Sequence, residues 1–195
     1  IIAGETESND KIFKESKGAY DCFLMELSSA GEMSWAKTYG GTSIDYCQKA
    51  VFDPSKAEVV MLGGTTSKNG DVNESHGGMD IWLSSYDLSG ELKSSVTYGG
   101  RNNEDPQDIA IDKDGNYLVL SGTNSNDGDI NSKNSYNKND FWLLKINPEI
   151  SNKKKNPGSI GHGIVKTYSA GFMVAGQEIL TNNNSDIFLQ EYDDT

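Results

Sequence analysis

The sequence Asp80-Ile81-Trp82-Leu83 indicates the fold, because its order of residue types returns along the whole chain. An aspartate, an apolar residue, an aromatic residue and a leucine occur together four times, and the other copies begin at Asp21, Asp140 and Asp186. The intervals between successive copies are 59, 60 and 46 residues. Self-similarity of this kind is typical of solenoids and propellers, in which one supersecondary unit is copied along the chain.

Two further markers keep a fixed order around this sequence. An apolar run that ends in glycine precedes each copy, at residues 1–4, 60–64, 119–122 and 173–176. A Thr-Tyr-Gly-Gly sequence follows the first two copies, at residues 38–41 and 97–100. Three markers in one order indicate a repeated structural unit.

Each repeat contains short apolar stretches separated by Gly, Asn, Asp and Ser, which is the pattern of β-strands joined by tight turns. In the second repeat we expect strands at residues 47–53, 58–65, 80–87 and 92–98, and the apolar stretch 58–62 indicates a buried inner strand. The predicted fold is all-β, with almost no helix and about three and a half four-stranded antiparallel β-propeller blades. The expected repeats are residues 1–46, 47–105, 106–160 and 161–195.

Two turns are predicted from local chemistry. The sequence Asp112-Lys113-Asp114-Gly115-Asn116 lies between two apolar runs, which is the signature of a tight hairpin. Residues 53–56 are expected to form the corresponding turn in the preceding repeat.

The markers resemble a known family. Residues 97–100, 109–112, 114–117, 121–123 and 140–145 are similar to the SBBP-type β-propeller repeat of bacterial surface and secreted proteins, and the likeness extends over the whole chain. The resemblance implies a propeller used as a binding or scaffold module, without shared catalytic residues, in an extracellular or cell-surface location. The chain departs from the pattern at residues 152–158, where a Tyr-Gly-Gly marker is expected, and in its shortened last repeat.

Composition excludes several classes of function. The chain has 195 residues, of which 29 are acidic and 17 basic, and its net charge of -12 repels phosphate backbones and argues against nucleic-acid binding. The chain carries no apolar run of the kind that a signal peptide or a membrane span requires. Cys22 and Cys47 have no metal-ligand spacing, and two cysteines exclude a fold held by a disulfide framework.

Two acidic loops are candidates for calcium binding. Asn69-Gly70-Asp71-Val72-Asn73 and Asp127-Gly128-Asp129-Ile130-Asn131 place side-chain oxygens at alternate positions, as a Ca²⁺ site requires. Aligned from Gly4, the first repeat has Lys11 where Asp71 and Asp129 stand, and an ammonium group there opposes a cation. We therefore favour a turn in which the carboxylate caps local backbone N–H groups, and we expect no metal and no cofactor.

The remaining candidates are interpreted as structural. Because they recur once per repeat, the four aspartates and the aromatic residues after them are expected to serve turns and packing instead of carboxylate catalysis or sugar stacking. His76 and His162 are expected in solvated glycine-rich connections, and Lys153-Lys154-Lys155 in a solvated turn. Cys22 is expected to be a small buried hydrophobe, and Cys47 aligns with Pro106. The recurring aspartates are Asp21, Asp80, Asp140 and Asp186, and the aromatic residues that follow them are Phe23, Trp82, Trp142 and Phe188.

The expected function is a non-catalytic binding or scaffold module whose partner is an unidentified protein or carbohydrate. One alternative is part of a propeller enzyme that acts on polysaccharide, with a non-repeating cluster of carboxylate, His or Tyr groups at its channel. A second alternative is carbohydrate binding without catalysis, for which Tyr136 in the third-repeat loop is the best candidate.

Counting strands gives three, four, four and three in the successive repeats. A three-stranded blade at each end of the chain would leave strand edges unpaired, which natural sheets avoid. We therefore expect the chain to be about half of a larger propeller, and to dimerise or aggregate when it is expressed alone.

Overall fold

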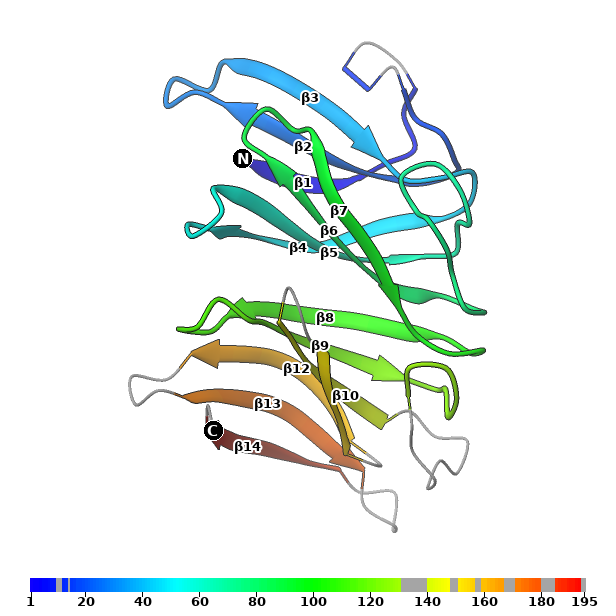
Figure 1. Cartoon of the computed structure of the whole chain (residues 1–195), viewed down its shortest axis with the longest axis vertical. Helices are drawn as coiled ribbons and strands as arrows, with labels where there is room; N and C mark the ends of the chain where they lie inside the picture. Colours follow the sequence, from blue (N-terminus) through cyan, green and yellow to red (C-terminus); the bar gives the residue numbers. More distant parts are fainter. Residues whose placement is uncertain are drawn as a thin grey trace. The chain divides into compact units, whose positions relative to one another are not determined.

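The computed structural model describes residues 1–9, 12–13, 15–130, 140–147, 151–156, 159–166, 171–179 and 185–193, and from residue 151 onward it describes the backbone alone. The chain divides into two compact units, Ile1–Tyr98 and Gly99–Thr195. Each unit contains two antiparallel sheets (Figure 1).

Unit 1 contains a three-stranded and a four-stranded sheet, each with its strands in chain order. The first sheet has the order β1-β2-β3 and the second the order β4-β5-β6-β7. β4 packs against β1 and β2 of the first sheet. The strands are β1 (Ile2–Thr6), β2 (Asp21–Leu27), β3 (Met33–Tyr39), β4 (Asp45–Asp53), β5 (Glu58–Thr65), β6 (Asp80–Asp87) and β7 (Leu92–Tyr98).

Unit 2 repeats the same plan with the larger sheet first. One sheet has the order β8-β9-β10-β11, and the other has the order β12-β13-β14. β12 packs against β8, β9 and β10. The strands are β8 (Glu104–Ile111), β9 (Tyr117–Thr123), β10 (Asp140–Ile146), β11 (Ser151–Asn156), β12 (Ser159–Lys166), β13 (Gly171–Ile179) and β14 (Ser185–Asp193).

The all-β prediction is confirmed, and the described part of the chain contains no helix. Its strands number three, four, four and three in successive sheets, as expected from the repeats. Three of the four strands expected in the second repeat have the observed bounds, whereas β4 begins at Asp45, two residues before the expected start. This start was missed because Asp45 is polar and resembles a loop residue. Its side chain instead accepts a hydrogen bond from the preceding loop.

The cores follow from strand alternation. In β5, Val59 and Met61 belong to a buried cluster with Cys22 and Leu24 of β2, and Trp82 and Tyr86 of β6 complete it. This cluster lies between the two sheets of unit 1, and the burial of each such side chain contributes about 1.5–3 kcal/mol to stability. Val60 and Leu62, on the other face of β5, are also buried, which confirms the expected inner strand. In unit 2 a cluster forms from Leu118, Leu120, Phe141 and Leu143.

Both predicted turns are present. Asp53 pairs with Glu58 across the first turn, and its carboxylate accepts the N–H of Ser55 at 2.9 Å. In the second turn the Asp112 carboxylate accepts the backbone N–H groups of Asp114 and Asn116, at 2.9 and 2.8 Å. It also accepts the Asn116 side-chain amide at 2.7 Å and pairs with Lys145 at 3.1 Å. Gly115 supplies the positive φ of 82° that this turn requires.

Replacing Asp112 with alanine is expected to lower the free energy of unfolding by about 1–3 kcal/mol at pH 7, because the variant leaves two backbone donors and Lys145 without their acceptor. Burial by itself would raise the pKa of Asp112, but the bonds from Asn116, Lys145 and the backbone hold that pKa below its ordinary value. The stabilisation is therefore complete above about pH 4 and is lost as the pH falls through the folded-state pKa.

Urea unfolding of the wild type and the variant at pH 7 and pH 3 measures this difference. Asp114→Ala is the matched control, because the exposed Asp114 side chain lies in the same turn, and we expect it to change stability by less than about 0.5 kcal/mol. An equal loss in the two variants would contradict the role of Asp112.

Candidate functional site

The recurring aspartates begin equivalent strands. β2, β6 and β10 begin at Asp21, Asp80 and Asp140, and β14 begins one residue before Asp186. The Asp21 carboxylate accepts the backbone N–H of Lys17, and the Asp80 carboxylate accepts that of His76, in both cases four residues upstream. The predicted use of these aspartates for local backbone donors is confirmed at these two positions. The side chain of Asp186 lies outside the described residues.

His76 lies in the exposed loop before β6, as predicted, and its ring also approaches Asp80. Its ring nitrogen Nδ1 lies 3.4 Å from the Asp80 carboxylate, and its side chain is 31% exposed. The ring is held there because the backbone of His76 already donates to the same carboxylate. His76 is therefore part of the loop closure before β6.

The double-glycine loop of unit 1 has its backbone N–H groups capped by side chains from a second loop and from the first residue of β4. Gly40 N–H donates to Asp71 at 2.9 Å, and Gly41 N–H donates to Asp45 at 2.7 Å. The next two donors follow in order, with Thr42 N–H bonded to Asn69 at 2.9 Å and Ser43 N–H bonded to Ser67 at 3.0 Å. We call these four bonds the capping network.

Unit 2 contains the same capping network around its own double glycine. Gly99 N–H donates to Asp129 and Gly100 N–H to Glu104, both at 3.1 Å. Arg101 N–H donates to Asp127 at 2.9 Å, and Asn102 N–H donates to Ser125 at 3.0 Å. Glu104 replaces Asp45 with the longer acidic side chain and keeps the same role.

Asp45 is the buried centre of the network in unit 1. It is fully buried, and besides Gly41 it accepts the hydroxyl groups of Thr65 and, at 2.7 Å, of Ser67. Burial raises the pKa of Asp45, and the bonds from Thr65, Gly41 and Ser67 partly oppose this rise. In unit 2, Thr123 donates to Glu104 at 2.8 Å in the same way. The acidic residue at this position therefore joins the start of one strand to the end of the next.

We predicted that the carboxylates of the two acidic loops cap local backbone N–H groups. They do cap backbone N–H groups, but these groups belong to another part of the chain. The donors lie 31 residues away for Asp71 and 30 for Asp129 instead of within the loop. Asp71 also forms an ion pair with Lys17 at 2.6 Å, and Asp127 forms one with Arg101. The side-chain oxygens of Asn69, Asp71, Asp127 and Asp129 thus accept protein donors. Asn131 lies outside the described residues.

The alignment of Lys11 with Asp71 is also wrong. Ser8 N–H donates to the Thr6 hydroxyl at 2.9 Å, as Ser67 N–H does to Thr65 and Ser125 N–H to Thr123. With Thr6 placed at the position of Thr65, Ile12 counts to the position of Asp71. Lys11 itself lies outside the described residues.

Gly70→Ala is expected to destabilise unit 1 more than Gly31→Ala. Both glycines have positive φ, 71° and 81° respectively, so both substitutions carry a backbone penalty of about 1 kcal/mol. A Cβ at Gly70 would meet the Gly40 carbonyl oxygen at 2.3 Å, whereas one at Gly31 would meet nothing within 4 Å. Gly31→Ala therefore serves as the matched control.

We expect the Gly70 substitution to cost at least about 1 kcal/mol more than its control, as overpacking does in other structures. Chemical unfolding of the two variants gives the difference directly. Equal losses would show that the close approach of the two loops contributes nothing to stability.

A pocket of about 700 Å³ lies within unit 1. Its lining comes from the segment before β2, from β3, from the Asp71 loop and from the hairpin between β6 and β7. β3 is the last strand of its sheet, and only one of its two edges pairs with a strand of that sheet, β2. Residues of β3 also line the pocket.

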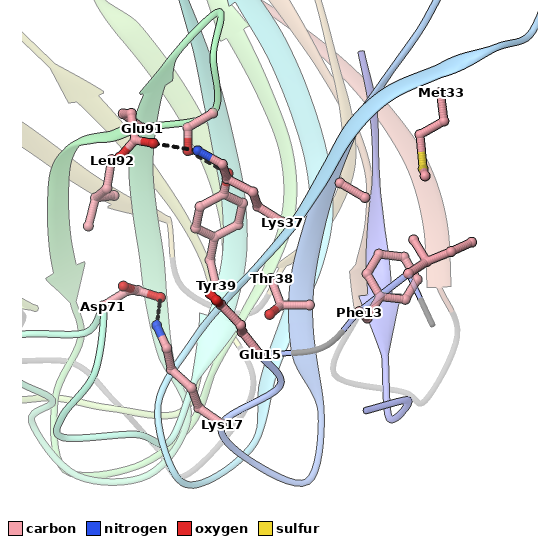
Figure 2. Close-up of a pocket in the computed structure, with 13 residues that line it drawn as sticks. Phe13, Glu15, Lys17, Met33, Lys37, Thr38, Tyr39, Asp71, Glu91 and Leu92 are labelled. Atoms are coloured by element: carbon pink, nitrogen blue, oxygen red, sulfur yellow. Dashed lines mark hydrogen bonds and ion pairs between the residues drawn. The ribbon is translucent and has the colours of Figure 1, made fainter. Parts of the chain in front are cut away.

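Tyr39 organises the polar end of the pocket. Its hydroxyl donates to the Gly90 carbonyl at 2.7 Å, and its ring packs on Tyr86 with 4.2 Å between ring centroids. Burial raises the pKa of Tyr39 far above its ordinary value, with Glu91 and Asp71 adding to the effect, so the hydroxyl remains a donor. Figure 2 shows the Lys17–Asp71 and Lys37–Glu91 ion pairs on opposite sides of this ring.

Phe13 and Met33 form a separate, apolar end of the pocket, away from the two ion pairs (Figure 2). Phe13 packs on Phe23 with 4.8 Å between ring centroids, and Met33 is 49% exposed. The pocket therefore offers apolar contacts at one end and charged groups at the other.

The pocket was not found from the sequence. Lys17 and Asp71 are 54 residues apart, as are Lys37 and Glu91, and no local pattern links them. The one available signal was Tyr39, which belongs to the Thr-Tyr-Gly-Gly marker but was interpreted only as a sign of the repeat.

The remaining sequence candidates have the following positions. Trp82 and Trp142 are buried, which confirms packing, while Phe23 is half-buried and the side chain of Phe188 lies outside the described residues. Cys22 is fully buried as expected, and Cys47 and Pro106 occupy equivalent bulges in β4 and β8. Tyr136 lies outside the described residues.

Two predictions for the last repeats are wrong. The lysines at 153–155 belong to β11 instead of a turn, and an edge strand such as β11 tolerates lysine well. His162 belongs to β12 at a register shift between Gly161 and Gly163, so its glycines mark a bulge instead of a connection.

Comparison with known proteins adds no assignment, because no family model matches the chain and no curated protein shows significant similarity to it. The described residues include no helix that is long and apolar enough to cross a membrane. They also include no group of three or more His, Cys, Asp or Glu side chains arranged to hold a metal ion.

Proposed function

We propose that this chain is a non-catalytic binding or scaffold module built from β-propeller blades of the SBBP type, in a bacterial surface or secreted protein. The meander sheets, with their markers at equivalent positions, support the proposal of blades. The observation that carries the non-catalytic function is the capping network. Its acidic side chains bind backbone N–H groups in both units, so their regular recurrence has a structural cause.

The pocket of unit 1 is the proposed ligand site, and an extended peptide segment of a partner protein is the ligand that fits it best. The pocket is bordered by β3, an edge strand, and a peptide can add to such an edge through backbone hydrogen bonds. Alternate side chains of the peptide then reach the apolar end at Phe13 and Met33 and the charged end at Lys37 and Glu91.

This proposal is tested by selecting binders from a phage-displayed library of seven-residue peptides, which have the same length as β3. Binding of a selected peptide to the full chain is then measured by fluorescence anisotropy. Met33→Asp is expected to weaken binding about tenfold or more, because the variant removes one apolar contact and places a charge there. Methylation of alternate peptide nitrogens is expected to weaken binding similarly, because it removes donors to the strand edge.

Phe52→Asp is the matched control, since Phe52 is 53% exposed on β4 and does not line the pocket. This variant is expected to bind like the wild type. Selected peptides that bind equally well to Met33→Asp, or after methylation, would place the site elsewhere. Release of reducing ends from bacterial or plant polysaccharides by the full chain would contradict the non-catalytic function.

A further inference from the structure

The two cysteines of the chain meet at the junction of the two sheets of unit 1. Cys22 lies in β2 and is fully buried, whereas Cys47 lies in β4 and is partly exposed. Cys47 packs against the core cluster to which Cys22 belongs.

The backbone explains why the thiols meet. Tyr20 and Ile44 form an isolated parallel bridge, and Asp45 N–H donates to the Tyr20 carbonyl at 2.9 Å. β2 and β4 continue from this bridge in the same direction and pack against each other. Cys22 follows the bridge by two residues and Cys47 by three, so the two cysteines lie at similar distances from it along neighbouring strands.

We propose that Cys22 and Cys47 form an intramolecular disulfide, with a low-molecular-weight disulfide such as oxidised glutathione as the oxidant. The bond would join the sheet β1-β2-β3 to the sheet β4-β5-β6-β7 covalently. It would therefore fix the two walls that border the pocket, and its formation does not depend on whether the pocket binds a ligand.

The reaction proceeds by two thiol–disulfide exchanges. The Cys47 thiolate, the more accessible of the two, attacks one sulfur of the oxidant and releases one molecule of reduced glutathione. The Cys22 sulfur then attacks the Cys47 sulfur of this mixed disulfide and releases the second molecule. The two cysteines lose two protons and two electrons in total, and one oxidised glutathione becomes two reduced molecules.

The order of attack follows from exposure. Burial raises the pKa of the Cys22 thiol well above its ordinary value, with the neighbouring Cys47 adding to the effect, and a buried thiol reacts poorly with a dissolved oxidant. Cys22 instead acts on the adjacent mixed disulfide inside the protein. A disulfide at this position suits the oxidising surroundings of a surface or secreted protein.

The test equilibrates the full, folded chain with oxidised and reduced glutathione at pH 8, followed by acid quenching and thiol titration of the denatured protein. We expect the titrated thiols to fall from two to none, with one cross-linked peptide pair about 2 Da lighter than its reduced components. The folded chain should hold this bond at least about tenfold more strongly than the chain unfolded in urea, because the fold brings the thiols together. The melting temperature should rise by about 5–10 °C on oxidation and return with dithiothreitol.

Cys47→Ser is the matched control, and its melting temperature is expected to be insensitive to glutathione. Two thiols that remain free in the folded wild type would overturn the proposal. A stable glutathione adduct on either cysteine, or a cross-link between two chains in place of the internal bond, would overturn it as well. Equal preference for the bond in folded and urea-unfolded chains would show that the fold does not bring the thiols together.

Discussion

Four successive backbone N–H groups of a loop, bonded to three side chains of a second loop and to the acidic side chain that begins the next strand, are the interaction on which the rest of this structure depends. Backbone donors that leave a sheet and remain inside a protein must find acceptors, since an unpaired buried donor costs about 1–3 kcal/mol. In unit 1 the buried Gly40 and Gly41 satisfy their donors with Asp71 and Asp45, and the more exposed Thr42 and Ser43 bond to Asn69 and Ser67. Unit 2 meets the same constraint with the equivalent residues.

The capping network also accounts for the double glycines and for the position of the pocket. A side chain at Gly41 would meet the Asn69 carbonyl oxygen at 2.4 Å, so the loops approach this closely only without one. The same contact places Asp71 beside Lys17 and next to Tyr39, at the polar end of the pocket. The capping network, which recurs in each unit, thus positions the charged Asp71 in the pocket of unit 1.

The sequence predicted those features whose causes are local. The apolar stretch in Glu58–Thr65, the repeated marker that begins Asp80–Asp87 and the turn chemistry at Asp112 depend on neighbouring residues, and these features were predicted correctly. Features that depend on distant partners were missed. The donor to Asp71 lies 31 residues away, and Cys22 meets Cys47 only because two sheets join at Tyr20 and Ile44. The start of β4 was missed because Asp45 looks like a loop residue until its buried partners are known.

Amide hydrogen exchange, followed by NMR, tests the central claim most directly. The amides of Gly40, Gly41 and Thr42 lie in a loop, yet each donates to a side chain of the capping network. We predict that these amides exchange as slowly as the amides of the inner strands of the sheet that follows the loop. The same is expected for the equivalent amides of Gly99, Gly100 and Arg101 in unit 2. In both units exchange then requires cooperative unfolding. Exchange at the rate of an open loop, while the adjoining strands remain protected, would contradict the account.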